Sequence, residues 1–227
     1  MKSLSRRLEV IASLIPQGAK VCDVGTDHGY LPIYLLKSGK ASKVIATDIR
    51  LKPLNTAKSN IEKFGVGNIE LRLCDGLEAV SSTEANTVII AGMGGEVISG
   101  IIERCVWAKD THKTFILQPM TSPEILRSFL FSSGFEILFE KPLEDNGKIY
   151  SVITAVFSGK PYRYKAYELF TGKISADTDE GFKYIKKQYN RCSECAESLK
   201  SITSKTEEYT YYQSISDALN ELLQEKK

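Results

Sequence analysis

The sequence has no apolar run that approaches the ~18 residues of a membrane-spanning helix. Residues 1–16 also lack the continuous apolar stretch and the small-residue cleavage site of a signal peptide. They instead predict an amphipathic helix, whose apolar face comprises Leu4, Leu8, Ile11, Ala12 and Ile15. With 227 residues and 42% hydrophobic content, the chain is long enough for one or two domains with a real core. We therefore predict a cytoplasmic protein without a membrane partner.

The sequence also has few side chains suited to hold a metal ion or a disulfide. Its five cysteines are an odd number without disulfide spacing, which is typical of a reducing compartment. Cys192 and Cys195 form a Cys-x-x-Cys pair, but no second ligand pair lies nearby in the sequence, and both histidines, His28 and His112, are far away. We interpret these cysteines as helix residues and predict no metal site.

A large charge imbalance is missing as well. The net charge is +2 at pH 7, whereas a protein held to nucleic acid by bulk charge is usually more basic. Any contact with RNA must therefore come from local groups, such as the stripe that Lys183, Lys187 and Arg191 form at i, i+4 and i+8. The same spacing is also typical of a solvated helix face.

One stretch of the chain combines a strand, a glycine turn and a helix. The β-branched run 20–24 leads into a turn with Gly25 and Gly29, and an apolar helical segment follows at 31–36. This order is the setting that a nucleotide-type cofactor loop requires. Glycine allows the backbone to turn tightly and to approach a ligand closely.

The glycine pattern departs from G-x-G-x-x-G in an informative way. Asp27 stands where the second glycine would be, and Asp23 lies near the end of the strand. Two carboxylates would repel a pyrophosphate, but they suit a cofactor with cationic groups, such as the ammonium and sulfonium of S-adenosylmethionine. The spacing D-x-G-x-D-x-x-x-L resembles motif I of the class I methyltransferases. The same residues also fit an ordinary tight turn between a strand and a helix.

The ends of later strands add further candidates. Strand 43–48 ends at Asp48, where folds of this kind hold ribose hydroxyls through a carboxylate. Strand 69–73 is followed by Asp75, and the apolar strand 87–91 leads into a Gly-Met-Gly-Gly run. Such strand ends form the ligand crevice of an open parallel sheet. The candidates for this crevice are Asp23, Gly25, Asp27, His28, Tyr30, Leu31, Asp48, Ile49, Asp75, Gly76, Ala91, Gly92 and Met93.

Strands and helices alternate five times in the first part of the chain. Such alternation predicts a parallel sheet with right-handed crossovers. The segments 135–141 and 148–157 flank an Asn-Gly pair at 146–147, which is a strong hairpin signal. We therefore predict an α/β, Rossmann-like domain over residues 1–159, whose mostly parallel sheet and antiparallel closing strand resemble the class I methyltransferases.

The pattern becomes helical in the remaining part of the chain. An a/d seam consists of Phe182, Ile185, Tyr189, Cys192, Ala196 and Leu199. The spacing is repeated, in a shifted register, by Tyr212, Ile215, Leu219 and Leu222. The polar segment 203–208 separates the two runs. Residues 160–227 are therefore predicted to form a second domain, with an antiparallel coiled-coil hairpin from about Thr178 to the end.

The segment after the fourth predicted strand bears on which kind of atom accepts the methyl group. Amino-methylating enzymes of this class commonly carry D/N-P-P-Y there, whereas this chain has Ala-Gly-Met-Gly-Gly at 91–95. Met93 or Tyr30 is available to pack on a flat base. A ring nitrogen with an in-plane lone pair attacks a sulfonium methyl without prior deprotonation, so the enzyme mainly has to align the reactants. Asp27 and His28 are candidates to steady the cationic product or to take its proton.

Several motifs spread over the chain share one resemblance. They are Leu4-Ser-x-Arg-Leu8, Asp23-x-Gly-x-Asp-His28, Ile90-Ala-Gly-Met-Gly-Gly95, Leu117-Gln-Pro119 and Gly147-Lys-x-Tyr150. Together they are similar to the bacterial tRNA (adenine-22-N1)-methyltransferases. The resemblance implies that S-adenosylmethionine is used to methylate adenine N1 in the D-arm of tRNA. It also implies that the cofactor is surrounded by Asp23, Gly25, Asp27, His28, Asp48, Asp75 and Gly92.

The resemblance further implies that the C-terminal hairpin holds tRNA. The candidates for RNA contact are Arg6, Arg7, Lys183, Lys187 and Arg191. Two positions depart from the pattern of the family. Its second-strand acid can be Glu where this chain has Asp48, and Asn commonly follows Leu-Gln-Pro where this chain has Met120. We predict a monomer.

Two other functions fit the same residues. A methyltransferase acting on a small molecule or a protein would carry the same cofactor motifs, with the helical hairpin as a dimerisation arm or lid. A non-catalytic RNA-binding protein on a decayed methyltransferase fold is the second alternative. The intact acids Asp23, Asp27, Asp48 and Asp75 argue against that alternative.

Overall fold

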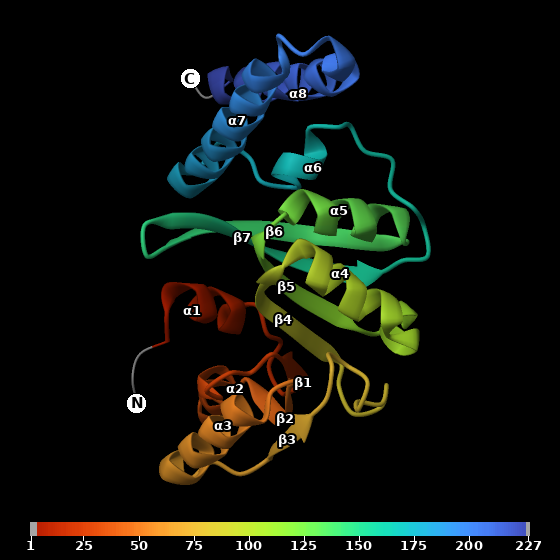
Figure 1. Ribbon diagram of the computed structural model, residues 1–227. Helices are drawn as coiled ribbons and strands as arrows, with labels where there is room; N and C mark the ends of the chain where they lie inside the picture. The colour runs from red at the N-terminus through yellow and green to blue at the C-terminus, as the bar shows by residue number, and fades with distance from the viewer. Residues whose placement is uncertain (1–3, 226–227) are drawn as a thin grey trace.

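A seven-stranded sheet forms the centre of the protein in the computed structural model, which describes residues 4–225 (Figure 1). Its strands are β1 (Ala19–Val24), β2 (Ala41–Asp48), β3 (Ile69–Leu73), β4 (Thr87–Gly94), β5 (Thr114–Thr121), β6 (Phe135–Asp145) and β7 (Lys148–Phe157). They are arranged in the order β3-β2-β1-β4-β5-β7-β6. Strand β7 runs antiparallel to β5 and β6, and the remaining pairs are parallel. The predicted α/β, Rossmann-like sheet with an antiparallel closing strand is therefore confirmed.

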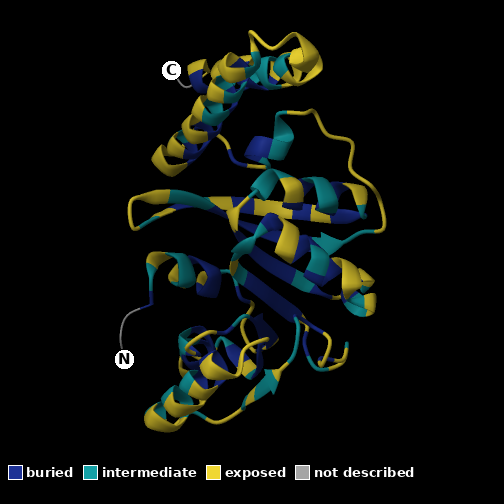
Figure 2. Cartoon of the chain, in the orientation of Figure 1, coloured by how far each residue is buried: buried dark blue, intermediate teal, exposed yellow. Residues whose placement is uncertain are grey.

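Helices cover both faces of the sheet. They are α1 (Arg6–Ser13), α2 (Tyr30–Lys37), α3 (Leu51–Phe64), α4 (Gly95–Arg104) and α5 (Pro123–Ser132). Because successive strand residues point to opposite faces, two separate cores result. On β4, Ile89 packs with α1 and α2, whereas Ile90 packs with α4 and α5. Figure 2 shows the sheet as the most buried layer, with exposed residues on the outer sides of the helices.

The local turn signals in the sequence have the expected conformations. Helix α3 ends at Gly65, which adopts the left-handed conformation with φ 61°. The two residues that connect β6 and β7, Asn146 and Gly147, also have positive φ, as a two-residue hairpin turn requires. The helix predicted near the N-terminus begins at Arg6 after its N-cap Ser5, and residues 1–3 of that prediction lie outside the described residues.

Strand β4 is longer than predicted. The predicted strand covers residues 87–91 and ends before the Gly-Met-Gly run, but the strand continues to Gly94. Met93 pairs with Pro119 and Gly94 with Thr121 of β5, and the register shifts on either side of Met93. Gly92 has φ +81°, which allows the strand to bulge and then resume its pairing. Met93 therefore extends from a bulged strand and not from a free loop.

The C-terminal part consists of helices, as the sequence predicts. They are α6 (Glu168–Thr171), α7 (Asp179–Leu199) and α8 (Thr206–Gln224), and short 3-10 turns lie at η1 (Val106–Lys109) and η2 (Thr203–Lys205). Ile185 and Cys192 of α7 are buried in one cluster with Ile215 and Leu219 of α8. This confirms the helical pair, although residues 226–227 of the prediction lie outside the described part of the chain. None of the helices within residues 4–225 has both the length and the apolar character that a membrane span requires.

A buried arginine joins the helical part to the sheet. The side chain of Arg127 on α5 is fully buried and forms an ion pair with Glu140 of β6, with 2.7 Å between Nη2 and Oε2. Its Nη1 donates to the carbonyl oxygens of Leu169 and Phe170, and its Nη2 donates to the Tyr184 hydroxyl of α7 at 2.9 Å. One side chain thus links α5, β6, α6 and α7.

Candidate functional site

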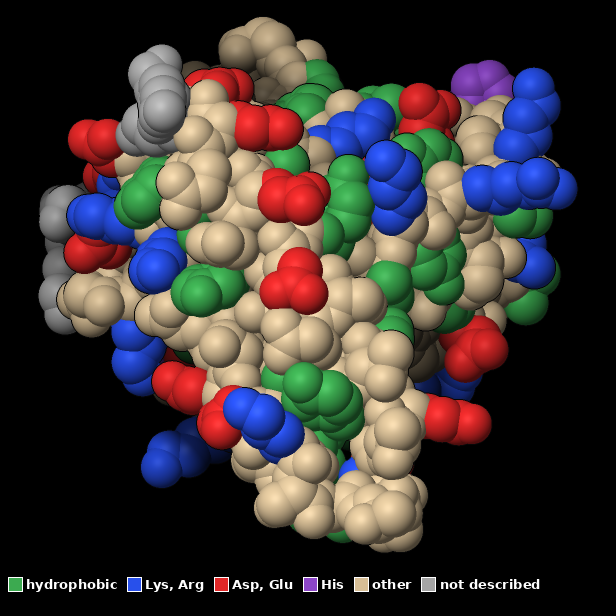
Figure 3. Space-filling model, turned by 90° about the horizontal axis from the view of Figure 1, so that it is seen from above, with side chains coloured by type: hydrophobic (Ala, Val, Ile, Leu, Met, Phe, Trp, Pro, Cys, Tyr) green, Lys and Arg blue, Asp and Glu red, His purple; other side chains and the backbone are tan. Residues whose placement is uncertain are grey.

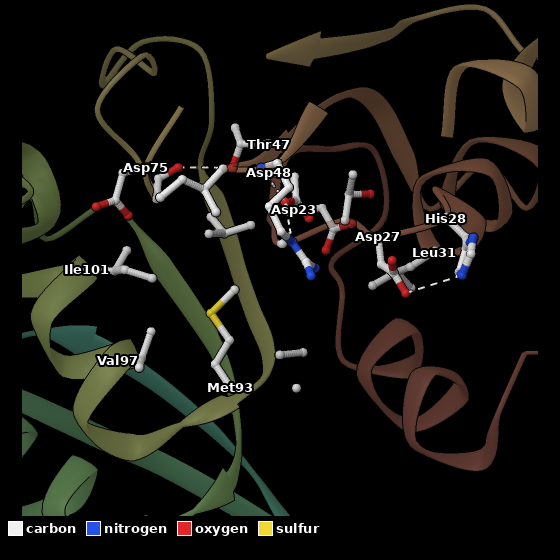
Figure 4. Close-up of a pocket in the computed structure, with 18 of the residues that line it drawn as sticks. Asp23, Asp27, His28, Leu31, Thr47, Asp48, Asp75, Met93, Val97 and Ile101 are labelled. Atoms are coloured by element: carbon white, nitrogen blue, oxygen red, sulfur yellow. Dashed lines mark hydrogen bonds and ion pairs between the residues drawn. The ribbon is translucent and has the colours of Figure 1, made fainter. Parts of the chain in front are cut away.

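A cavity of about 580 Å³ opens at the ends of β1, β2 and β4, where the strand order reverses between β1 and β4. Its volume lies within the range of roughly 300–1,000 Å³ that is typical of small-molecule sites. It is lined by all residues predicted for catalysis or cofactor binding, namely Asp23, Gly25, Asp27, His28, Tyr30, Leu31, Asp48, Ile49, Asp75, Gly76, Ala91, Gly92 and Met93. Figure 4 shows side chains from both halves of the sheet converging on this space.

The turn after β1 is held in a fixed position against β2. The amide groups of Gly25 and Thr26 donate to the carbonyl oxygen of Thr47 at 2.8 and 3.0 Å. Gly25 has φ +75°, and a Cβ atom added to it would lie 2.3 Å from Cε of Met93. The left-handed conformation favours glycine here, and any larger residue would make the flexible end of the Met93 side chain move.

A Gly25→Ala substitution is expected to weaken binding of S-adenosylmethionine about tenfold or more, because the new methyl group displaces Met93 into the cavity. Gly18→Ala is a matched control, since Gly18 has φ +73° but nothing within 4 Å of an added Cβ. Both variants carry the same cost of about 1–2 kcal/mol for a left-handed residue with a side chain. Titration calorimetry should show reduced affinity only for Gly25→Ala, and equal affinities in the two variants would contradict this explanation.

Two buried carboxylates lie at the ends of β1 and β2. Asp23 and Asp48 are each only 5% exposed. Burial raises the pKa of the Asp23 carboxyl to about 6, and the Asp48 carboxylate acts in the same direction. Oδ1 of Asp48 accepts a hydrogen bond of 2.8 Å from the amide of Arg50. The same oxygen of Asp48 lies 3.6 Å from Nε of Arg50, which offsets part of its charge. Within the described part of the chain Asp23 has no such ion pair, and when ionised it favours a cationic group at the inner wall.

The opposite wall of the cavity is largely apolar. Val97 and Ile101 extend from α4 toward the cavity (Figure 4). Met93 extends from β4 and lies between these two side chains and the turn after β1. Asp75 lies at the edge of this wall, where its Oδ2 accepts from Arg104 at 3.0 Å. Gly76 is tightly packed, since an added Cβ would lie 2.8 Å from Cγ2 of Ile101. A flat aromatic group therefore finds an apolar surface with a carboxylate at its rim.

Asp27 and His28 form an exposed pair at the mouth of the cavity. Nε2 of His28 lies 3.4 Å from Oδ2 of Asp27, and both side chains are more than half exposed. The backbone carbonyl of His28 accepts a hydrogen bond of 2.9 Å from the Asn60 side chain. The centroid of the His28 ring lies 5.7 Å from the centroid of the Tyr30 ring. In Figure 4 the pair lies on the side of the cavity away from Val97.

The predicted RNA-contact residues fall in three places. Arg7 lines the cavity, where its Nη1 donates to Oε1 of Gln118 at 2.8 Å, while Arg6 is exposed on α1. Lys183, Lys187 and Arg191 share one side of α7, as their spacing predicts, but this side contacts β6, β7 and α5. Lys183 forms an ion pair with Glu144 of β6 at 2.6 Å, and Arg191 forms one with Glu124 of α5. Lys187 donates to the carbonyl of Ile149 at 3.0 Å.

Some lining residues were not among the sequence candidates. They are Leu8, Val24, Thr26, Thr47, Arg50, Cys74, Val97 and Ile101. Thr47 and Cys74 directly precede Asp48 and Asp75, so their positions at strand ends would have identified them. Val97 and Ile101 have the spacing of core residues in a helix. Val97 is 53% exposed because it faces the cavity, and periodicity alone gives no sign of this.

Residues 4–225 contain no group of three or more His, Cys, Asp or Glu side chains placed to hold a metal ion. Cys192 is a buried residue in the helical cluster, and Cys195, on the same helix, is a partly exposed free thiol.

The sheet order, the antiparallel β7 and the acid-lined cavity at the end of β1 define a class I methyltransferase. Residues 4–153 match the family model described as "Methyltransferase domain". The tRNA (adenine(22)-N(1))-methyltransferase of Bacillus subtilis (strain 168) is 37% identical over 172 residues, which cover 75% of this chain and 72% of that protein. The chain belongs to the tRNA (adenine(22)-N(1))-methyltransferase family.

Two solved structures extend this similarity to the whole chain. The B. subtilis m1A22 tRNA methyltransferase TrmK is 30% identical with a TM-score of 0.83, and the match covers 99% of both chains. The Streptococcus pneumoniae protein Sp1610, solved in complex with S-adenosyl-L-methionine, is 30% identical with a TM-score of 0.81. That match covers 97% of this chain and 100% of Sp1610. Both matches include the C-terminal helices.

Proposed function

We propose that this protein transfers a methyl group from S-adenosylmethionine to N1 of an adenine in the D-arm of tRNA. The strongest support is that the similarity to the B. subtilis tRNA methyltransferase covers the cofactor cavity and also α7 and α8. A cofactor domain alone would define only the methyltransferase class, whereas the complete chain matches enzymes named for one position in tRNA. Neither alternative, a small-molecule or protein methyltransferase or a non-catalytic RNA-binding protein, has a comparable observation in its favour.

The proposal is tested with unmodified tRNA and a labelled methyl donor. Nucleoside analysis should recover the label as 1-methyladenosine, and primer extension should stop at one position in the D-arm, because N1-methyladenine cannot pair normally. Label in another nucleoside, or in a protein or small molecule, would favour the alternative substrates. If calorimetry detects no binding of S-adenosylmethionine, the non-catalytic reading is supported instead.

The cavity residues fit this cofactor. All three acids line the cavity, and we assign Asp23 to neutralise the cationic end, Asp48 to accept from the ribose hydroxyls, and Asp75 to accept from the adenine amino group. Leu31, Ile49, Gly76 and Ala91 supply the surrounding surface. When bound, S-adenosylmethionine supplies a methyl group on a sulfonium, which the lone pair of adenine N1 attacks while the bond from sulfur to that methyl breaks.

Met93, Asp27 and His28 are the residues that we assign to the target base. Met93 extends into the cavity from the bulge in β4, and this position supports our assignment that it packs on the face of an adenine. Methylation leaves a positive charge on the base, and Asp27 and His28 lie at the mouth, where a carboxylate and an imidazole can steady that charge or take a proton. The base has to leave its stack first, at a cost of a few kcal/mol.

Substituting the pair at the mouth should slow the reaction more than it weakens cofactor binding. We expect Asp27→Ala and His28→Ala each to lower kcat for tRNA methylation by roughly 10- to 100-fold, at or just below the lower end of the range for side chains that transfer protons. Single-turnover kinetics at saturating donor measures this directly. Full activity in both variants would remove Asp27 and His28 from the mechanism.

The remaining parts of the proposal concern the assembly. We assign tRNA contacts to Arg6, Arg7, Lys183, Lys187 and Arg191, with residues 1–159 as the cofactor-binding domain and residues 160–227 as the tRNA-holding domain. Figure 3 shows acidic and basic side chains interspersed over the C-terminal face, so contacts with RNA depend on individual side chains. Action as a monomer in the cytoplasm completes the proposal, and light scattering of the purified protein tests the oligomeric state.

A further inference from the structure

A second hollow of about 350 Å³ lies between the end of β5, the start of β7 and α7. It adjoins the cofactor cavity across one strand pair. Met93 of β4 lines the cavity, and its Cα partner on β5, Pro119, lines the hollow. Because neighbouring strands are about 4.8 Å apart, the residues that line the two spaces lie within the length of one nucleotide of each other at this point.

One side of the hollow carries a positive charge that no carboxylate neutralises. Nζ of Lys187 donates to the carbonyl of Ile149, which leaves two of its three protons for a ligand. None of the ion pairs within residues 4–225 involves Lys187. Burial, with the nearby charges of Arg191 and Lys148, lowers the pKa of Lys187. An anion bound at this point would offset the repulsion between Lys187 and the cationic side chains of Arg191 and Lys148.

Another side of the hollow provides an aromatic ring. The centroid of the Tyr150 ring lies 5.8 Å from Nζ of Lys187, and Tyr150 lines the same space. A cation beside an aromatic surface matches a phosphate and the base next to it.

We propose that this hollow binds a nucleotide of the RNA substrate that neighbours the methylated adenine. Its phosphate contacts Lys187 and its base packs on Tyr150, while the target adenine occupies the adjoining space at Met93. The inference rests on the proposed function, since it takes the RNA to be the methyl acceptor. Under this proposal, the residues where β5, β7 and α7 meet position the RNA substrate, and they also join α7 to the sheet.

The phosphate contact is tested by measuring the affinity for unmodified tRNA at several salt concentrations. Each lost phosphate contact should reduce the slope of log K against log[salt] by about 0.7–0.9. We expect this reduction, with an affinity loss of about tenfold, for Lys187→Ala. Lys186→Ala is the matched control, because Lys186 is exposed on the same helix, lies over the ring of Tyr189 and does not line the hollow. Unchanged slopes, or equal losses in both variants, would overturn the inference.

The base contact is tested with Tyr150→Ala and Tyr150→Phe. Loss of one stacked base should raise the KM for tRNA about tenfold in Tyr150→Ala, whereas Tyr150→Phe keeps the ring and should restore it. The affinity for S-adenosylmethionine should be unchanged in both. If the wild type methylates tRNA and the Lys187 and Tyr150 variants do so with normal KM, the inference fails and the proposed function stands. If the wild type binds tRNA but does not methylate it, the proposed function fails. The salt dependence of tRNA binding then still shows whether Lys187 in the hollow contacts a phosphate.

Discussion

The Arg127→Leu variant should unfold at a temperature roughly 6–20 °C below that of the wild type. Removing the guanidinium leaves Glu140 charged and fully buried without a partner, which typically costs about 3–5 kcal/mol. It also removes the donors for the carbonyl oxygens of Leu169 and Phe170. For a chain of this size, each kcal/mol corresponds to about 2–4 °C in the unfolding midpoint. Differential scanning calorimetry gives the value directly.

Two further variants separate the buried charge from the loss of a side chain. In Arg127→Leu/Glu140→Leu, no charge is left in the interior, so part of the lost stability should return. Lys205→Ala breaks the exposed ion pair with Glu208 and should change the free energy of unfolding by less than about 1 kcal/mol. The explanation is wrong if Arg127→Leu melts at the same temperature as Lys205→Ala, or if the double variant is less stable than the single one.

The Asp23→Asn variant should be more stable than the wild type without ligand and should bind S-adenosylmethionine on the order of 10- to 100-fold more weakly. The folded state raises the pKa of Asp23 from 3.8 to about 6, because the carboxyl is buried beside a second acid. The folded protein therefore holds this proton more tightly than the unfolded chain. An amide of the same shape removes the buried charge and also the group that attracts the cationic cofactor.

The sign of the pH dependence follows from this shift. Since the folded pKa lies above the unfolded one, Asp23 opposes folding as the pH rises from about 4 to about 6, and the loss is complete above that range. A shift of about two units corresponds to roughly 3 kcal/mol. Asp23→Asn should therefore be more stable above about pH 7, and the difference should shrink as the pH falls toward 4. Cofactor affinity of the wild type should fall below about pH 6, where Asp23 is protonated.

Thermal unfolding of both proteins across this pH range, with and without cofactor, provides the measurement. Asp48→Asn is a suitable control. Asp48 is equally buried, but one of its oxygens already accepts a backbone hydrogen bond, so its replacement should give a smaller gain. Equal stability of Asp23→Asn and the wild type at neutral pH would show that burial of the Asp23 carboxylate does not destabilise the folded protein. Unchanged cofactor affinity would show that it does not hold the cation.

The position of the cofactor cavity could be predicted from the sequence because its residues lie at strand ends. Asp23, Asp48 and Asp75 each mark the end of a run with clear β periodicity, and a parallel sheet brings such ends together. Glycine gave a second local signal, since Gly25 and Gly92 need conformations that other residues avoid. These signals act over a few residues, so a single sequence is enough to detect them.

The contacts between the two parts of the chain could not be predicted in this way. Arg127 and Glu140 look like ordinary surface charges on an amphipathic helix and an edge strand, and nothing local indicates that they are buried against each other. The spacing of Lys183, Lys187 and Arg191 correctly places them on one side of a helix. It does not say what that side faces, and the acids that pair with two of them are distant in the sequence. Likewise, the extension of β4 through Met93 depends on pairing with β5.

The way in which Arg127 holds α6 has a consequence for the divergence of related sequences. Its contacts to residues 169 and 170 are made to main-chain carbonyl groups, which every amino acid possesses. Substitutions at these two positions therefore leave the hydrogen bonds in place, and they act through packing alone, since Phe170 is buried in the C-terminal cluster and Leu169 packs against it. A related chain can thus change these apolar side chains for others that fill the same space and keep the polar anchoring point, as long as Arg127, Glu140 and Tyr184 are retained.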